Sequence, residues 1–282
     1  MNPKKLLSLA LALTMGLSLT ACGGGKAPSA SPSEAAGSAA PAESAAGSSD
    51  LAYVKDKGVL VVGITEFEPM DYQDKNGSWI GFDADMARAF AGSLGVECQF
   101  QVIDWDNKVL ELDGKNIDVV WNGMTLTDEV TSAMACSNAY CNNAQVVIVP
   151  SARAADYQSV DSVKDLAFAV EVGSAGKAEV EALGASYTEV QDQATALLEV
   201  SSGTADAAVI DSLMAAAMVG AGTSYADLTY TVGLNSEEYG VGFRKGSDLA
   251  AALNEFFQTA YADGSMQKTA ETYGVQAALI EQ

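Results

Sequence analysis

The sequence predicts an α/β fold in which mostly parallel sheets are flanked by helices. From residue 51 onward, short runs rich in β-branched residues alternate with segments of helical spacing. This alternation is typical of parallel sheets whose strands are joined by helical crossovers. The 232 residues of this part (282 minus 50) are enough for two modest lobes, each with its own core.

The first part of the alternation begins with a buried strand over 59–64 that ends in a loop. A helix is predicted after it over 84–94, with Asp83 as a plausible cap and Gly95 as its end. The predicted elements that follow are a strand over 98–103, a short helix over 107–112 and a strand over 118–121.

The alternation then starts again after a turn. We expect strands over 145–149, 167–172, 207–210 and 241–244 and helices over 162–166, 176–183, 194–201, 248–263 and 265–273, with a further segment near 228–232. Polar residues directly after such strands are candidates for ligand contacts, because ligands of α/β sheets bind at the carboxyl ends of the strands.

The first 21 residues are predicted to be an export signal. Lys4 and Lys5 precede an apolar run over 6–19 that is too short to span a membrane. The run closes on Leu-Thr-Ala-Cys at 19–22, which resembles the bacterial lipobox. That resemblance implies cleavage before Cys22 and a lipid on its thiol, so the protein would be held on the extracytoplasmic side of the cell membrane. A plain secretory signal with an incidental cysteine is the alternative.

Residues 22–50 are predicted to form a flexible tether. They consist mainly of Gly, Ala, Ser and Pro, which bury too little apolar surface to offset the entropy of ordering. Removal of residues 1–21 takes away two lysines and no acid, so the formal charge changes from −22 to −24. A surface this acidic repels nucleic acid, which we exclude as a partner.

The composition also excludes several kinds of site. The chain has no histidine, which removes the commonest acid-base residue, the commonest metal ligand and every Ser-His or Cys-His nucleophile. After lipidation three cysteines remain, Cys98, Cys136 and Cys141, without a C-x-x-C pattern. Free thiols are expected, with a Cys136–Cys141 disulfide as the alternative. No metal and no cofactor are expected.

Eight short segments, in order, resemble the amino-acid-binding branch (family 3) of bacterial extracellular solute-binding proteins. They are FEP at 67–69, GSWIGFDAD at 77–85, DWD at 104–106, IDVVWNGMTLT at 117–127, VGS at 172–174, AVID at 208–211, YGVGFRKG at 239–246 and ADGS at 262–265. Each is weak alone, whereas their order and spacing together are specific. The resemblance covers essentially the whole body, from residue 59 to 273.

The resemblance implies the type II periplasmic-binding-protein fold, in which two α/β lobes joined by two crossing strands close over a ligand. For this chain it implies a first lobe of 51–142 plus 240–282 and a second lobe of 143–239. The crossings are expected near 142–146 and 237–241. A hinge of this kind concentrates closure in a few backbone angles.

Carried onto this sequence, the resemblance also implies a site. Phe67 and Trp105 stand where the family has aromatic or bulky side chains that sandwich the ligand, and the polar residues around them suggest that both are exposed. Two ordinary core aromatics are the alternative. Gly123 and Thr125 match positions that hold a ligand's amino and carboxylate groups, and Asn122 adds an amide beside them.

Two further positions belong to the predicted second lobe. Ser174 precedes a helix, so backbone N–H groups are expected there to face an anionic group. Asp211 follows the strand over 207–210, at the family's position for the acid that grips the ligand's α-ammonium. Asp211 capping the next helix is the alternative, and both roles can coexist.

The sequence departs from the family at the carboxylate grip. The family's arginine position is Val130 here, and the threonine that usually follows Gly-Ser is Ala175. Losing a charge-assisted hydrogen bond forfeits about 1.5 to 3 kcal/mol. Either helix-terminal amides with help from Lys108 or Lys177 replace the arginine, or the ligand has no free carboxylate. Amines and modified amino acids are therefore expected alongside common amino acids.

The resulting expectation is a monomeric, non-enzymatic substrate-binding lipoprotein of an ABC importer. Its partners would be a small polar ligand (an amino acid or a related amine), a membrane permease and the membrane itself through the lipid on Cys22. A sensory lipoprotein with the same fold is an alternative. A dehydratase of the same fold is another, because Glu66 and Glu68 stand near the expected cleft, but such a reaction needs the cationic grip that is missing.

Overall fold

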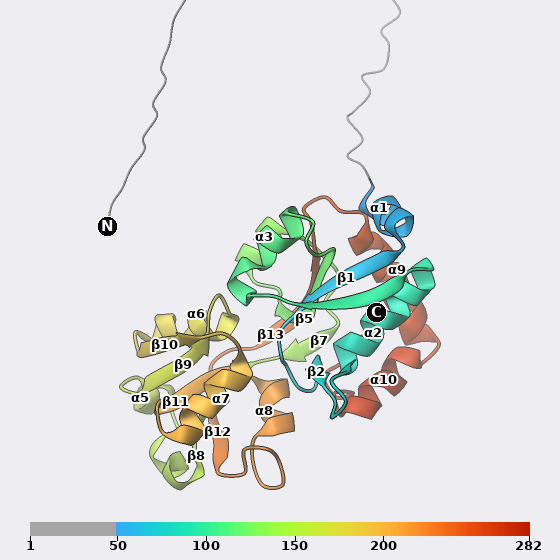
Figure 1. Cartoon of the computed structure of the whole chain (residues 1–282). Coiled ribbons are helices and arrows are strands. Elements are labelled where there is room, and N and C mark those ends of the chain that lie inside the picture. The colour runs from blue at the N-terminus through green and yellow to red at the C-terminus, as the bar shows by residue number, and fades with distance from the viewer. Residues whose placement is uncertain (1–48) are drawn as a thin grey trace, which may run out of the picture. The chain divides into compact units, whose positions relative to one another are not determined.

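The structure, a computed structural model, describes residues 49–282. It contains two main sheets, each flanked by helices (Figure 1). We call the part built on the sheet of β1 the first lobe and the part built on the sheet of β9 the second lobe. The predicted signal, Cys22 and the predicted tether up to residue 48 lie outside the described residues.

The sheet of the first lobe has the strand order β4-β1-β5-β13-β6, and β7 also pairs with β13. β1 runs parallel to β4 and β5, whereas β13 runs antiparallel to β5, β6 and β7. The strands are β1 (Val59–Ile64), β4 (Glu97–Val102), β5 (Val119–Thr125), β6 (Ala135–Cys136), β7 (Cys141–Asn143) and β13 (Glu237–Phe243), with a separate pair of β2 (Tyr72–Gln73) and β3 (Trp79–Ile80).

The sheet of the second lobe has the order β10-β9-β11-β8-β12. β9 runs parallel to β10 and β11, whereas β8 runs antiparallel to β11 and β12. The strands are β8 (Gln145–Pro150), β9 (Ala167–Glu171), β10 (Ser186–Val190), β11 (Ala207–Asp211) and β12 (Leu228–Gly233).

Helices complete both lobes. Those of the first lobe are α1 (Asp50–Lys57), α2 (Phe82–Leu94), η1 (Trp105–Asn107), α3 (Lys108–Asp113), α4 (Asp128–Ala133), α9 (Leu249–Ala262) and α10 (Ser265–Tyr273). Those of the second are η2 (Ser151–Asp156), α5 (Val160–Val163), α6 (Ala175–Leu183), α7 (Gln193–Ser202) and α8 (Ser212–Met218). In Figure 1, α2, α9 and α10 gather on one side of the first sheet, where α10 packs on both α2 and α9.

The two-lobed α/β class predicted from the sequence is confirmed, but both sheets are mixed rather than mostly parallel. The chain enters the second sheet at β8 directly from β7, and it returns directly from β12 to β13. Parallel pairing requires a crossover of a dozen or more residues. β8 enters the second sheet from the other lobe without such a crossover. It therefore starts at the end of the sheet that faces the first lobe and runs antiparallel to its neighbours.

Each lobe encloses apolar side chains of its own. In the first lobe Trp121 of β5 is fully buried and packs edge-on against Phe257 of α9, with ring centroids 5.6 Å apart. In the second lobe Phe168 of β9 packs with Val147 and Val180 under α6. Burial of one such aromatic or aliphatic side chain contributes on the order of 1.5–3 kcal/mol.

Three local predictions differ from the structure. Asp50, assigned to the tether, is the first residue of α1 and is buried. Asp83 does not cap α2, since Gly81 is the N-cap residue and Asp83 points into the lobe, where it accepts a hydrogen bond from Tyr140 at 2.7 Å. The strand β10 was missed, because four of its five residues are exposed and it carries little of the apolar pattern that marks buried strands.

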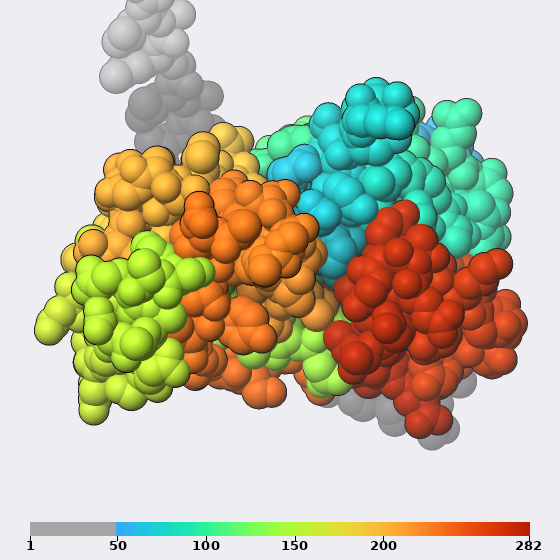
Figure 2. Space-filling view, turned by 90° about the horizontal axis from the view of Figure 1, so that it is seen from below, coloured from blue at the N-terminus to red at the C-terminus, as the bar shows by residue number. Residues whose placement is uncertain are grey.

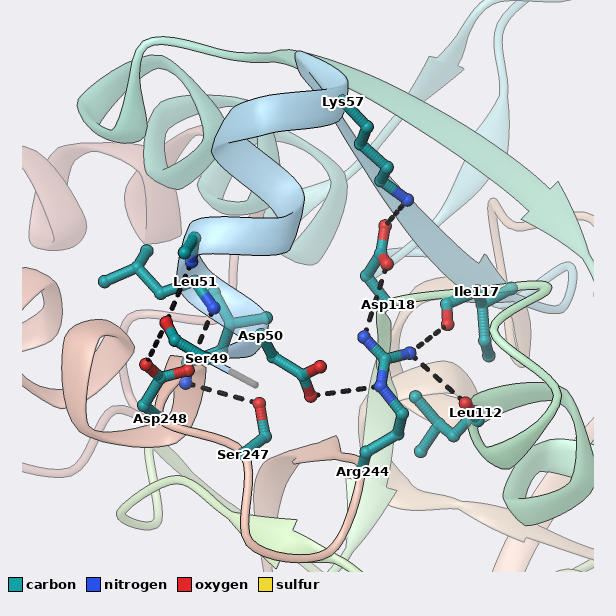
Figure 3. Close-up of polar contacts among 12 residues, drawn as sticks. Ser49, Asp50, Leu51, Lys57, Leu112, Ile117, Asp118, Arg244, Ser247 and Asp248 are labelled. Carbon is teal, nitrogen blue, oxygen red and sulfur yellow. Dashed lines mark hydrogen bonds and ion pairs between the residues drawn. The ribbon is translucent and has the colours of Figure 1, made fainter. Parts of the chain in front are cut away.

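An ion-pair cluster around Arg244 ties the start of α1 to the first sheet (Figure 3). The Arg244 side chain is 9% exposed; its Nε lies 3.0 Å from Asp50 and its Nη2 lies 3.5 Å from Asp118. The Nη1 atom donates to the carbonyl oxygens of Leu112 and Ile117. Residues far apart in the chain thus share one buried cation.

The three described cysteines, Cys98, Cys136 and Cys141, are free thiols. Burial raises the pKa of all three, to about 12 for Cys98, so they are unreactive thiols at neutral pH. Within residues 49–282 we find no helix with the length and apolar character that crossing a bilayer requires.

Candidate ligand-binding site

A cavity of about 450 Å³ lies between the two lobes. On the first lobe its wall is formed by the loop after β1, by η1 and α3, and by the end of β5 with α4; on the second lobe the ends of β9 and β11 and the starts of β8, α6 and α7 contribute. Figure 2 shows the two lobes meeting, with the first in teal and red and the second in yellow and orange. The cavity has the size of a small-molecule site.

All seven ligand-binding residues predicted from the sequence line this cavity. They are Phe67, Trp105, Asn122, Gly123, Thr125, Ser174 and Asp211. They come together there because each residue follows or ends a strand, and strand ends of both sheets meet at the cavity. Their roles in binding stay predictions, and the contacts they make within the protein differ widely.

The two aromatic residues are buried, with Phe67 3% and Trp105 7% exposed. The expectation that polar neighbours expose them was wrong, because each packs in an apolar cluster of buried side chains. Phe67 lies against Gly123, where a Cβ atom would stand 2.4 Å from the ring, and packs edge-on against Tyr239. The Lys108 ammonium lies 5.0 Å from the centre of the Trp105 ring.

The Asn122 side chain makes its hydrogen bonds to other residues of the first lobe. Its Oδ1 accepts hydrogen bonds from the backbone and hydroxyl of Thr65, and its Nδ2 donates to Thr65 O and to Asp71 at 2.8 Å. The Gly123 N–H donates to Asp83 at 2.7 Å. Asn122 and the Gly123 amide therefore hold the shape of the wall rather than offering free groups to the cavity.

The two hydroxyl residues are also engaged. Thr125 Oγ1 donates to Glu237 at 2.9 Å, across to the start of β13. Ser174 is the N-cap residue of α6, and its hydroxyl accepts from the Lys177 N–H at 3.1 Å. The first amides of a helix lack partners within the helix, and Ser174 and Ala175 at the start of α6 line the cavity.

Asp211 ends β11 and is 3% exposed. It is the N-cap residue of α8 by position, but its side chain makes no capping hydrogen bond, so capping does not explain it. Its carboxylate instead accepts from four side chains: Asn143, Gln145 and Tyr239 at Oδ1 and Gln193 at Oδ2. Burial, followed by repulsion from Glu237, raises the pKa of Asp211 to about 7.

Sequence reasoning missed the polar network that surrounds Asp211. Asn143 and Gln145, on the chain that passes from the first lobe to the second, each donate both to Asp211 and to Glu237 on the returning strand. The sequence contained a signal for this network, because Asn143, Gln145 and Glu237 stand at the predicted crossings. A polar side chain that is buried there needs a hydrogen-bond partner.

Sequence reasoning also missed Glu171, the last residue of β9. It lines the cavity, is 3% exposed, and its Oε1 is buried without a hydrogen-bond partner among residues 49–282. Burial raises the pKa of Glu171 well above its usual range, and the nearby acids Asp211 and Asp192 add to the rise, while Lys108 and hydrogen bonding with Gln193 oppose it. The sequence did carry a signal for Glu171, because an acidic residue ends an apolar strand shortly before the Gly-Ser pair at 173–174.

The lobes touch across the cavity. Lys108 Nζ, on α3, donates to the carbonyl oxygens of Trp105 and of Gly173 in the second lobe, both at 3.1 Å. Burial lowers the pKa of Lys108, an effect that nearby acids, Glu171 first, oppose. This contact joins α3 of one lobe to the β9–α6 loop of the other.

Val130 and Ala175, at the family positions for the carboxylate grip, both line the cavity. The three arginines of the chain lie elsewhere: Arg244 in the buried cluster, Arg88 paired with Asp85 and Arg153 paired with Asp156.

Glu66 and Glu68, the proposed acid-base pair of a dehydratase, are not among the lining residues. No group of His, Cys, Asp or Glu side chains in the described part of the chain is arranged to hold a metal ion.

Comparisons with known proteins agree with this geometry. The L-cystine-binding protein TcyJ of Escherichia coli K12 is 28% identical over 224 residues, 78% of this chain and 84% of that protein. A crystal structure of a mutant ArgBP from T. maritima matches with a TM-score of 0.74 and 30% identity, covering 80% of this chain and 99% of that chain.

A third relative is a crystal structure of an ancestral amino-acid-binding protein, described as a precursor of cyclohexadienyl dehydratase. It has a TM-score of 0.73 and 30% identity, and the match covers 80% of this chain and 99% of that chain. The sequence profile of one family matches residues 60–276, which is most of the described part. The chain belongs to the bacterial extracellular solute-binding proteins, family 3.

Proposed function

We propose that this chain is the extracytoplasmic, lipid-anchored substrate-binding protein of an ABC importer, and that it captures an amino acid or a related amine between its two lobes. The observation that carries the proposal is the cavity of about 450 Å³ between the lobes, which collects strand ends and buried polar groups from both sheets. A ligand held there contacts both lobes at once, so binding favours the closed arrangement.

Family membership supports the binding role. TcyJ and the ancestral amino-acid-binding protein are both named for amino-acid ligands. The cavity of this chain has aromatic walls from Phe67 and Trp105 and an acid, Asp211, at the end of a strand. Binding rather than catalysis is the role that we propose, because the family's arginine position is Val130 and the two lysines of the cavity, Lys108 and Lys177, are engaged by the protein itself.

A thermal-shift screen of the purified chain tests the binding role. Amino acids, their amines and small dipeptides are added singly, and a ligand that binds only the folded chain raises the unfolding temperature by mass action. We expect a concentration-dependent rise for at least one member, confirmed by isothermal titration at one site per chain. The role fails if no member of the screen binds.

Membrane attachment is tested at Cys22. In a bacterial host that processes lipoproteins, the wild-type chain is expected in the membrane fraction and labelled by a fatty-acid analogue, whereas Cys22→Ser is expected unlabelled and released. Cys98→Ser is the matched control, because Cys98 lies in β4 of the folded body. Equal labelling of the wild-type chain and Cys22→Ser contradicts the anchor.

Transport and sensing differ in the membrane partner. A permease and an ATPase encoded beside this chain favour import, and reconstitution of the three components in vesicles is then expected to give ligand uptake that requires ATP. A neighbouring membrane kinase, with ligand-dependent phosphorylation and no uptake, would instead establish the sensory role.

A further inference from the structure

The cavity between the lobes is strongly acidic. Six carboxylate side chains line it, against two ammonium groups, so the formal charge of its wall is −4 (two minus six) when all are ionised; the acids are Asp106, Asp128, Glu129, Glu171, Glu181 and Asp211, and the cations are Lys108 and Lys177. Glu171 and Asp211 are buried, whereas Asp106, Asp128, Glu129 and Glu181 are exposed to solvent. Like charges gathered around one cavity raise the local concentration of cations.

The two lysines do not neutralise this wall for a ligand. Lys177 Nζ lies 2.7 Å from Glu189, outside the cavity lining, and 3.8 Å from Glu181. Lys108 directs its ammonium at two backbone carbonyl oxygens, those of Trp105 and Gly173. Both cations are held by the protein itself, so neither is arranged to meet a ligand's carboxylate.

Two acceptor atoms at the cavity have no donor among residues 49–282. They are Glu171 Oε1 and Gln145 Oε1; Glu171 is 3% and Gln145 1% exposed. Leaving a buried acceptor unpaired costs about 1–3 kcal/mol, and more for a charged group. Both atoms only accept hydrogen bonds when Glu171 is ionised, so the complementary ligand group is a donor with positive charge.

Asp211 differs from Glu171 in this respect. Three donors already reach its Oδ1 and a fourth reaches Oδ2. Asp211 therefore adds negative charge to the wall when it is ionised, while the buried Oε1 of Glu171, at the end of the neighbouring strand β9, has no donor among residues 49–282. The contact that sequence reasoning assigned to Asp211 is better placed on Glu171.

The other side of the cavity disfavours an anion. α4 contributes Asp128, Glu129 and Val130 to the lining, so an apolar side chain and two acids stand where the family's arginine would meet a carboxylate. A ligand carboxylate there would stand beside two like charges, which is electrostatically unfavourable.

We propose that the ligand is an amine that carries cationic nitrogen groups and no free carboxylate, and that Glu171 determines this specificity by accepting hydrogen bonds from an ammonium or guanidinium group. The proposal rests on the solute-binding function proposed above and narrows its ligand class. A diamine or a guanidino amine with a short alkyl chain has the charge for the acidic wall and an apolar middle for Phe67 and Trp105.

Matched pairs of ligands test the proposal. Each pair consists of an amino acid and its decarboxylated amine, so the members differ in one carboxylate: lysine and cadaverine, ornithine and putrescine, arginine and agmatine, histidine and histamine. Isothermal titration of the purified chain is expected to show, in at least one pair, an amine that binds at least tenfold more tightly than its parent. The proposal that the ligand is an amine is overturned if the amino acid binds more tightly than its amine in every pair that binds. It is also overturned if none of the eight compounds binds.

The role of Glu171 is tested by the isosteric change Glu171→Gln. It removes the charge and keeps the shape, so we expect the preferred amine to bind about ten- to a hundredfold more weakly, a loss of roughly 1.5–3 kcal/mol. Glu255→Gln, on the exposed face of α9, is the charge-matched control and is expected to bind as the wild-type chain does. Unchanged amine affinity in a folded Glu171→Gln variant overturns the assignment.

The outcomes separate the two proposals. If an ordinary amino acid from the wider screen binds with micromolar affinity while the amines do not, the solute-binding function stands and the amine class falls. If neither the pairs nor the wider screen yields a ligand, both fall.

Discussion

Gly173 of the second lobe lies directly against Asp106 of the first: a Cβ atom built on Gly173 would stand 2.5 Å from Asp106 Oδ1. The approach is so close that a methyl group does not fit, and Gly173 also has a positive φ of 67°. Lys108 adds a hydrogen bond to the Gly173 carbonyl oxygen beside this contact. The absence of a side chain at residue 173 thus lets the lobes meet over the cavity.

We therefore expect Gly173→Ala to weaken ligand binding by opposing closure. Overpacking at a tight contact costs about 1–3 kcal/mol, which corresponds to a roughly 5- to 150-fold loss of affinity. Isothermal titration measures the loss, and small-angle scattering should show a smaller ligand-induced decrease in the radius of gyration than in the wild-type chain.

Gly184→Ala is the matched control. Gly184 has nearly the same backbone, with φ at 70°, but no atom lies within 4 Å of a Cβ placed there. Both variants bear the same left-handed strain, of about 1 kcal/mol or more, and only Gly173→Ala meets the opposite lobe. Equal affinities in the two variants would show that strain, not contact between the lobes, explains the effect.

Val130→Arg should move specificity from amines toward amino acids. Val130 lines the cavity from α4, and an arginine there supplies the bidentate carboxylate grip that the wall lacks. We expect the affinity for lysine or arginine to rise about ten- to a hundredfold and that for the matching amine to fall. Val130→Met, similar in length but uncharged, is the control; a parallel gain in this variant would argue against a charge effect.

The stability of the ligand-free chain should increase as the pH falls from about 8 to about 5.5. Burial raises the pKa of both Asp211 and Asp83 to about 7, against about 4 in the unfolded chain. Between these values the folded chain binds more protons, so acid favours folding. Urea unfolding should show a higher midpoint at the lower pH, with a smaller difference in Asp211→Asn. A midpoint that rises with pH in this range contradicts the expectation.

Amine binding should show the opposite pH dependence. A cation favours ionised carboxylates, and Glu171 and Asp211 both have raised pKa values, caused first by burial. The charged groups that act on Glu171 are Asp211, Asp192 and Lys108, and Glu237 acts on Asp211. Binding should release protons near neutral pH and strengthen as pH rises, as titrations in buffers of different ionisation enthalpy will show. Proton uptake on binding would refute this.

Removal of the Arg244 side chain should be severely destabilising. Asp118 is fully buried and Asp50 nearly so; Arg244→Met would leave Asp50 without this cation and Asp118 with Lys57 alone, 2.5 Å away. Breaking a buried ion pair from one side costs about 3–5 kcal/mol, whereas Arg153→Met, at an exposed pair, should cost about 0–1 kcal/mol. Denaturant unfolding compares the two, and similar losses would mean that the cluster in Figure 3 contributes little.

Local sequence patterns predicted much of the site because of where its residues stand in their elements. Asp211 and Thr125 end strands, and Ser174 begins a helix, so sequence position alone brought them to the cavity. Glu171 has the same placement but was not selected, since a single acid after an apolar run is also typical of a solvated strand end.

The sequence by itself determined the α/β class, the two lobes and the set of strand ends that meet between them, because apolar periodicity and turn residues act over short stretches of chain. Only the tertiary structure decided which polar groups are free. Asp211 meets Gln193 from 18 residues away and Asn143 from 68, and these partners saturate it, whereas Glu171 Oε1 has none. Hydrogen-bond saturation depends on side chains brought together from distant parts of the chain, so only the tertiary structure could motivate the proposed ligand contact at Glu171 in place of Asp211.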